Sequence, residues 1–206
     1  MIISNKYKFI FIAIPKTGTS SVESVLNKFS TNKMQDTNKH YYLHQLTDFR
    51  VDDYFTFTFV RNPWQRHLST YFYYIKMVKY WKQSSIKKSS DWYGVYKAYV
   101  KTLSECDTFS DWVHKLYCRK WLENSDWDPV QLSWAKEVDF VGRFETLQAD
   151  FNTICDKIGI PKQKLPHRNK TKHKHYTEYY DEETKQIVAE KYAKDIEYFG
   201  YEFGEL

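Results

Sequence analysis

A loop at residues 15–21, with the sequence PKTGTSS, places a lysine, a glycine and several hydroxyl side chains directly after the apolar run FIFIAI. A strand that ends in such a loop and continues into a helix directs backbone N–H groups toward an anion. The glycine lets the main chain approach closely, and the lysine can reach a bridging oxygen. The alternative is an ordinary turn with a Ser/Thr helix cap. We predict an anion-binding loop in which Lys16, Gly18, Thr19 and Ser20 contact the anion.

The order of residues in this loop differs from that of an ATP-binding P-loop, Gly-x-x-x-x-Gly-Lys-Ser/Thr. Here the lysine precedes the glycine, and the Ser/Thr that helps to hold Mg²⁺ for a triphosphate is missing. The next apolar strand, FTFV, ends in Arg61 instead of an aspartate. A sulfuryl group carries less charge than a phosphoryl group and needs less metal, so these differences favour a phosphosulfate as the ligand.

A second candidate cluster begins at Arg61 in the sequence VRNP. Pro63 suits the first turn of a helix, where its missing N–H costs nothing, and Ser69 lies further along that predicted helix. An arginine fork and a serine hydroxyl together make a credible phosphate clamp. The alternative for Arg61 is a salt bridge at the edge of a sheet.

The elements that position these residues follow from hydrophobic periodicity. Strands are predicted where apolar residues run together or alternate, as Phe and Thr do in YFTFTFV, and helices where they recur at helical spacing. The predicted strands cover residues 6–14, 54–60 and 137–142, and the predicted helices cover 19–29, 64–82, 145–158 with Gly159 as C-cap, and 182–199 with Asp181 as N-cap. This strand–helix alternation predicts an α/β fold with a parallel sheet, in a single domain over residues 1–206.

Composition bounds the possible functions only broadly. The chain has 206 residues and a formal net charge of +5, which is consistent with an anionic ligand. Its cysteines, at positions 106, 118 and 155, are odd in number and widely spaced, so neither a disulfide framework nor a zinc site is predicted. We find no transmembrane stretch and no secretory signal at the N-terminus, and therefore expect a cytoplasmic protein.

Four segments of the chain together resemble the carbohydrate sulfotransferase family, which uses 3′-phosphoadenosine-5′-phosphosulfate (PAPS). They are IPKTGTSS, FTFVRNPWQRHLSTY, VDFVGRFETLQADFNTIC and DIEYFGYEF, and they follow one another from about residue 8 to residue 203. The resemblance implies a P-loop NTPase-like sheet flanked by helices, and PAPS as co-substrate without a metal. It also implies that the loop from Lys16 to Ser20 binds the 5′-phosphosulfate, and that Arg61 and Ser69 bind the 3′-phosphate.

A basic segment at residues 162–175 has two interpretations. Related sulfotransferases have a loop resembling LPxxNKT that closes over the nucleotide, which implies that Asn169, Lys170 and Thr171 contact it. A short basic run can also be a solvated face or a surface that touches nucleic acid. The histidines in the segment have no cysteine or carboxylate beside them to complete a metal site.

Sulfuryl transfer to a hydroxyl needs a base for the acceptor proton and positive charge at the leaving oxygen. Lys16 is the candidate for the charge, because it belongs to the phosphosulfate loop. The family often has a histidine about twenty residues before its VRNP motif, which implies His40 as the base, with His44 as an alternative base or a substrate contact. Gln131 resembles a family position near the acceptor cleft.

We therefore predict a sulfotransferase that moves a sulfuryl group from PAPS to a hydroxyl, on a carbohydrate. A P-loop kinase that uses Mg-ATP is the alternative enzyme, and a basic nucleic-acid-binding module is the alternative from another class. Magnesium dependence would distinguish the kinase, and salt-sensitive oligonucleotide binding without turnover would indicate the module.

Overall fold

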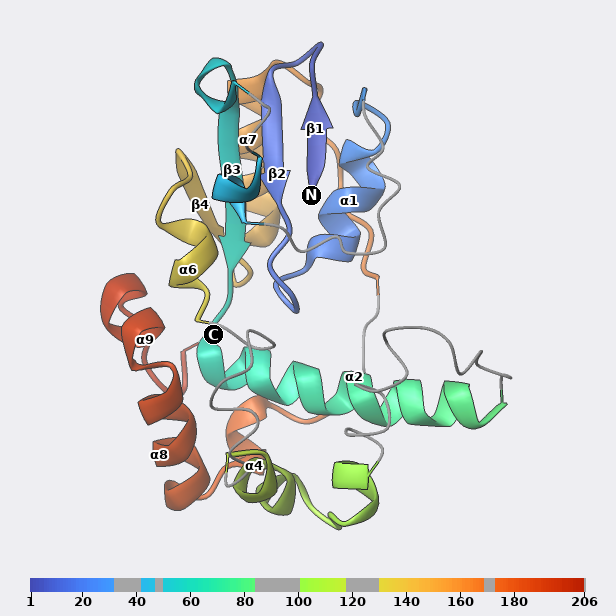
Figure 1. Ribbon diagram of the computed structural model, residues 1–206, viewed down its shortest axis with the longest axis vertical. Coiled ribbons are helices and arrows are strands. Elements are labelled where there is room, and N and C mark those ends of the chain that lie inside the picture. The colour runs from blue at the N-terminus through green and yellow to red at the C-terminus, as the bar shows by residue number, and fades with distance from the viewer. Residues whose placement is uncertain (32–41, 47–49, 84–100, 118–129, 169–172, 206) are drawn as a thin grey trace. The chain divides into compact units, whose positions relative to one another are not determined.

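The structure is a computed structural model that describes residues 1–31, 42–46, 50–83, 101–117, 130–168 and 173–205 (Figure 1). The chain packs as two compact units, which are described one at a time. The first unit contains residues 1–62 and 130–170, and the second contains residues 63–129 and 171–205.

The first unit is built on a four-stranded sheet with strand order β1-β2-β3-β4. Its strands are β1 (Ile2–Ser4), β2 (Phe9–Ile12), β3 (Phe55–Val60) and β4 (Phe140–Arg143). β2, β3 and β4 run parallel, and β1 pairs antiparallel with β2 at one edge. The predicted α/β fold with a parallel sheet is therefore confirmed. The sequence prediction missed β1 and made the first parallel strand too long.

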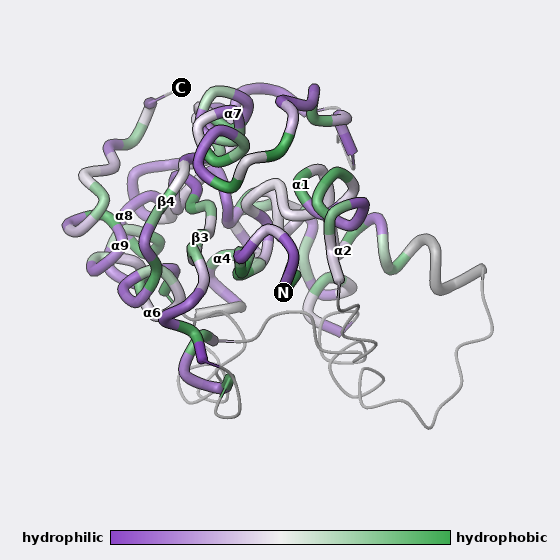
Figure 2. Tube along the Cα trace, turned by 90° about the horizontal axis from the view of Figure 1, so that it is seen from above, coloured by the Kyte–Doolittle hydropathy of each residue, from purple (hydrophilic) through white to green (hydrophobic). Residues whose placement is uncertain are grey.

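Two helices of this unit share one hydrophobic core with the sheet. α1 (Thr19–Leu26) and α7 (Leu147–Ile158) contribute Val22, Val25, Phe151 and Ile154 to a cluster with the phenylalanines of β2 and β3. Burying each such side chain stabilises the fold by about 1.5–3 kcal/mol. α7 keeps hydrophilic residues on its other side, as the alternating colours of its coil show (Figure 2). The core fixes the carboxyl ends of β2 and β3, where the candidate site begins.

Shorter elements complete the first unit. The 3₁₀ helices η1 (Leu43–Gln45) and η2 (Val51–Asp53) precede β3, and α6 (Leu132–Ala135) precedes β4. α6 packs beside β3, whereas α7 lies behind the sheet in the view of Figure 1. The predicted C-cap of α7 is confirmed, because Gly159 adopts a left-handed conformation with φ 71°.

The second unit is helical and has an aromatic core. Its elements are α2 (Pro63–Gln83), α4 (Phe109–Tyr117), η3 (Tyr176–Tyr179), α8 (Glu182–Lys191) and α9 (Ala193–Phe199). Trp112 is fully buried, and its ring lies 4.7 Å from that of His67 and 5.3 Å from that of Tyr71, measured between centroids. This core explains the helical spacing of aromatic residues in α2.

The last predicted helix is correct at its start and its end, but it is not continuous. Asp181 caps α8 as expected, with its side chain accepting a hydrogen bond of 2.8 Å from the Thr184 N–H. The predicted single helix to residue 199 is divided at Tyr192, where φ is −109°. Because Tyr192 is fully buried, packing of its ring outweighs the local preference for a continuous helix. Within the described ranges no helix has the length and apolar character that crossing a membrane requires.

Candidate active site

The loop that follows β2 has an unusual backbone at two positions. Lys16 adopts φ 69° and Gly18 adopts φ 83°, both in the left-handed region. The Thr17 hydroxyl between them donates a hydrogen bond of 3.0 Å to the Ile14 carbonyl and is fully buried. Left-handed residues in a short turn orient successive N–H groups toward one side, as anion-binding loops do. A lysine held in this conformation costs about 1–3 kcal/mol, and such strain clusters at functional sites.

Gly18 is required at its position for a second reason. A Cβ atom there would lie 2.9 Å from Leu147 Cδ2 and 3.1 Å from Phe144 Cδ2. The loop after β2 therefore packs directly against the segment that joins β4 to α7. The close approach and the positive φ angle both favour glycine.

The loop continues into the amino end of α1. The carbonyl of Gly18 accepts the N–H of Ser21 at 2.9 Å, and α1 has no acidic residue in its first turn. The positive end of the helix dipole therefore lies next to the loop without a carboxylate to offset it. Thr19 is buried and Ser20 is half-buried. These features fit the phosphosulfate that the sequence predicts for residues 16–20.

Arg61 follows β3 and joins the ends of all three parallel strands. Its Nη1 donates a hydrogen bond of 3.1 Å to the carbonyl of Lys16, in the loop after β2. Its guanidinium carbon lies 3.9 Å from the centroid of the Phe144 ring, directly after β4. In open α/β sheets, ligands bind outside the carboxyl ends of the strands. Arg61 thus places a permanent positive charge where the fold predicts a ligand.

The main chain around Arg61 is held by two side chains that are distant in sequence. The side-chain amide of Gln131 accepts the Arg61 N–H at 2.8 Å and donates to the Arg61 carbonyl at 2.9 Å. Glu145 Oε1 accepts the N–H of Asn62 at 2.7 Å. Gln131 is fully buried, so the structure gives it a role in holding Arg61. Its predicted contact with the acceptor stays a prediction.

A polar hollow lies along α1 beside the loop. It has a volume of about 470 Å³, is open to solvent, and is lined by Ser20, Glu23, Ser24, Asn27 and Arg168. The Arg168 N–H donates to Ser21 Oγ at 3.4 Å, which brings the basic segment against α1. Sequence analysis did not identify Arg168, because it lies within a basic run in which each charge has the same local pattern.

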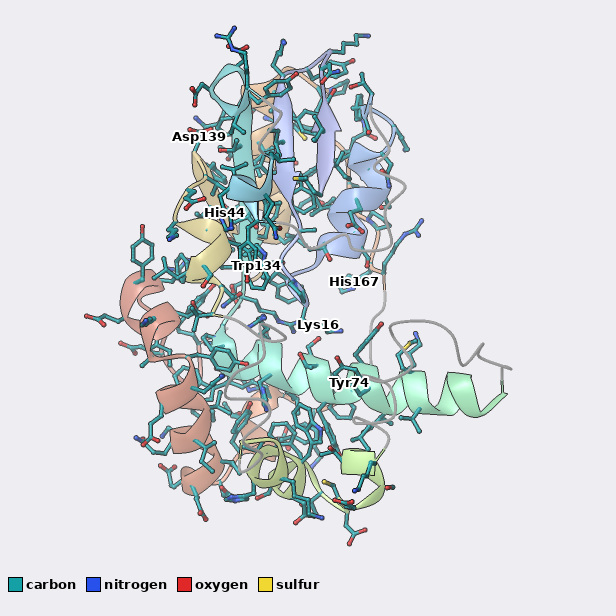
Figure 3. The ribbon with its side chains drawn as sticks, in the orientation of Figure 1. Lys16, His44, Tyr74, Trp134, Asp139 and His167 are labelled. Carbon is teal, nitrogen blue, oxygen red and sulfur yellow. The ribbon has the colours of Figure 1, made fainter. Side chains whose placement is uncertain are left out.

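His44, in η1, lies at one end of a stack of rings whose other end is Trp134 of α6. Its ring is 5.3 Å from that of Tyr42 at an interplanar angle of 17°, and Tyr42 lies 4.9 Å from the Trp134 ring at 12°. His44 Nδ1 is 3.8 Å from Glu137 Oε2, and 62% of the histidine side chain is exposed. Figure 3 shows His44 and Trp134 close together beside α6, and Lys16 in the loop beyond β2. The histidine is therefore held in place but open to solvent.

The family model for the sulfotransferase family matches residues 1–202 of the chain. The chain belongs to the sulfotransferase family. It is 26% identical to carbohydrate sulfotransferase 9 of Homo sapiens, over 94% of this chain and 47% of the human protein. It is 25% identical to carbohydrate sulfotransferase 14 of Mus musculus, over 78% of this chain and 47% of the mouse protein.

A third relative of this sulfotransferase-family chain is an uncharacterized protein of Archaeoglobus fulgidus, with 27% identity over 54% of this chain and 73% of the archaeal protein. No solved structure was found to match the chain. The chain spans about half the length of the two carbohydrate sulfotransferases that it matches. The family assignment and the α/β sheet agree with the predicted P-loop-like fold.

The structure brings together one part of the predicted site. Lys16 and Arg61 share a hydrogen bond, and Gln131 holds Arg61. Ser69 lies half-buried on α2 in the second unit, so its predicted pairing with Arg61 stays a prediction. Among the described residues, no group of three or more His, Cys, Asp or Glu side chains could hold a metal ion. The remaining predicted site residues lie outside the described residues: His40, Asn169, Lys170 and Thr171.

Proposed function

We propose that this sulfotransferase-family chain transfers a sulfuryl group from PAPS to a hydroxyl on a carbohydrate. The observation that carries the proposal is the contact between Arg61 and the Lys16 loop. The guanidinium lies beside the loop that we propose to bind an anion, and PAPS carries anionic groups at both its 5′ and 3′ positions. The names of the two relatives, carbohydrate sulfotransferases 9 and 14, support a carbohydrate as the acceptor.

Different residues of the chain bind different parts of PAPS, which supplies the activated sulfuryl group. The backbone of the loop at residues 16–20 and the amino end of α1 hold the 5′-phosphosulfate. Arg61, together with Ser69, holds the 3′-phosphate through charge-assisted hydrogen bonds. The hollow beside α1 is proposed to accommodate a further part of the nucleotide, and Asn169, Lys170 and Thr171 are proposed to contact the nucleotide.

The chemical step needs positive charge on one side of the sulfuryl group and a base on the other. Lys16 stabilises the charge that develops on the leaving phosphate oxygen, an interaction that is strongest in the transition state. His40 takes the proton of the acceptor hydroxyl, since a neutral imidazole with a pKa near 6.5 suits this task at pH 7. His44 is proposed to lie on the acceptor side.

Thermal unfolding of the purified protein with four nucleotides tests the donor. We expect 3′-phosphoadenosine-5′-phosphate (PAP), the product of transfer, to raise the melting temperature without added metal, and AMP, ADP and ATP to raise it less. A ligand at one hundred times its dissociation constant adds about 2.7 kcal/mol to the free energy of unfolding. A shift with Mg-ATP but none with PAP would instead support the P-loop kinase.

Calorimetry with Arg61→Ala then tests the 3′-phosphate assignment. The affinity of this variant for PAP should fall far more than its affinity for AMP, because AMP lacks the 3′-phosphate. Each hydrogen bond to a charged group contributes about 1.5–3 kcal/mol. Arg50→Ala is the matched control, because the Arg50 side chain is 89% exposed and pairs only loosely with Asp53, at 3.8 Å. Transfer itself is measured with radiolabelled PAPS and a panel of carbohydrate acceptors.

A further inference from the structure

The side chain of Gln131 binds the main chain of Arg61 as a neighbouring strand would. Both its amide oxygen and its amide nitrogen are used, at 2.8 and 2.9 Å. We propose that Gln131 is a positioning residue that orients Arg61 for the 3′-phosphate of the nucleotide, an inference that rests on the proposed function of Arg61. It differs from the acceptor contact predicted for Gln131, because here Gln131 acts on the donor, through Arg61.

The position of Arg61 explains why it needs such a partner. The parallel ladder between β3 and β4 ends at the pair Val60 and Arg143. Arg61 is the next residue, so its N–H and carbonyl lie beyond the last residue of β3. Gln131, 70 residues away in sequence, supplies the missing donor and acceptor. A main chain held at both groups has a fixed direction for its Cα–Cβ bond, and this direction determines where the side chain begins.

The far end of the same side chain is also fixed. The guanidinium donates to the Lys16 carbonyl at 3.1 Å and lies over the Phe144 ring at 3.9 Å. Gln131 therefore fixes the base of the arginine side chain, and the Lys16 carbonyl and the Phe144 ring contact its tip. A side chain that is ordered before the ligand arrives loses less conformational entropy on binding. The affinity for a 3′-phosphate should depend on this order.

Burial separates this role from a direct contact with ligand. The Gln131 side chain is fully buried, so its effect on a nucleotide passes through Arg61. If Gln131 only stabilised the fold, changing it would lower the affinity for all nucleotides to the same extent. If Gln131 positions Arg61, changing it should lower the affinity only for nucleotides that carry a 3′-phosphate. The ratio of PAP affinity to AMP affinity therefore distinguishes the two roles.

The test is calorimetry with PAP and with AMP on the full chain and on Gln131→Met, which has a similar volume and no amide. We expect the dissociation constant for PAP to rise about 10-fold to 100-fold, which corresponds to the loss of one charge-assisted hydrogen bond to phosphate. The constant for AMP should change less than about threefold, within the scatter expected of an uncoupled site. In an Arg61→Ala background, the same substitution should leave the PAP-to-AMP ratio unchanged.

Asp139→Ala is the matched control, because Asp139 also holds the main chain of β3. Its Oδ2 accepts the Thr56 N–H at 2.8 Å, at the end of the sheet away from Lys16 (Figure 3). This variant should lose stability and keep the PAP-to-AMP ratio of the wild type. If Gln131→Met does not fold, Gln131→Asn replaces it, since its amide is one methylene too short to reach both main-chain groups of Arg61 and should give the same selective loss.

The outcomes separate this inference from the proposed function. If the wild type prefers PAP, and Arg61→Ala abolishes the preference, but Gln131→Met or its replacement affects PAP and AMP equally, the positioning role is refuted and the function of Arg61 stands. If the wild type shows no preference for PAP over AMP, the assignment of Arg61 fails and the inference fails with it.

Discussion

Replacing Gly18 with alanine would test whether the loop after β2 is as tightly packed as the structure indicates. Gly18 has φ 83°, a conformation that costs an L-residue about 1–2 kcal/mol. The new Cβ would also lie 2.9 Å from Leu147 Cδ2 and 3.1 Å from Phe144 Cδ2, and overpacking of this kind costs about 1–3 kcal/mol. We therefore expect Gly18→Ala to lower the free energy of unfolding by about 2–5 kcal/mol.

Gly159→Ala isolates the backbone contribution. Gly159 has a similar φ of 71°, but a Cβ atom there would meet nothing within 4 Å. Gly159→Ala should therefore lower the free energy of unfolding by only about 1–2 kcal/mol. The difference between the two variants, about 1–3 kcal/mol, measures the close approach of the loop to the segment after β4.

Urea unfolding of the wild type and both variants provides the free energies, and calorimetry provides the affinity for PAP. Gly18→Ala should also lower the affinity for PAP, because a displaced Phe144 ring would displace the guanidinium of Arg61 that lies over it. Gly159→Ala should bind PAP as the wild type does. Equal losses of stability in the two variants, with unchanged binding in both, would refute the packing argument.

Three further predictions concern the two proposed catalytic groups and a helix cap. Lys16→Ala should lower turnover much more than affinity for PAP in radiolabel assays, and unchanged turnover would reduce Lys16 to a binding residue. His40→Ala should lose about 10²–10⁴ in turnover and still bind PAP, whereas a loss only in His44→Ala would transfer the role of base to His44. Asp181→Ala should cost about 1 kcal/mol at pH 7. Hydrogen bonds from Thr184 lower the pKa of Asp181 below its ordinary 3.8 in the folded protein, so this stabilisation is present above that value and is lost as the pH falls. Urea curves of wild type and variant should therefore converge in acid, and a constant difference would contradict the cap.

The sequence was most informative where local pattern and tertiary structure agree. The alternation of Phe and Thr predicted β3, because successive side chains of a strand face opposite sides of the sheet. The spacing of Phe151 and Ile154, followed by Gly159, predicted α7 and its cap. β1 was missed because its three residues are too short for any periodicity to appear.

The candidate site was predictable only in part. The loop at residues 15–21 and Arg61 carry residue types whose chemistry is visible in the sequence. The contacts that organise them are not, because Gln131 reaches Arg61 across 70 residues and no local pattern encodes that pairing. The same holds for the Phe144 ring, which belongs to a strand–helix turn and meets the guanidinium only in the folded protein.

The positive φ angle of Lys16 lowers the stability of the fold at a residue that we propose takes part in the reaction. Lysine is held there at φ 69°, where glycine would be far less strained. Proteins commonly give up stability at positions that chemistry requires. Lys16→Gly should therefore relieve strain that Lys16→Ala retains. Measured together, the two variants separate what the ammonium group contributes to turnover from what the fold gives up to hold it.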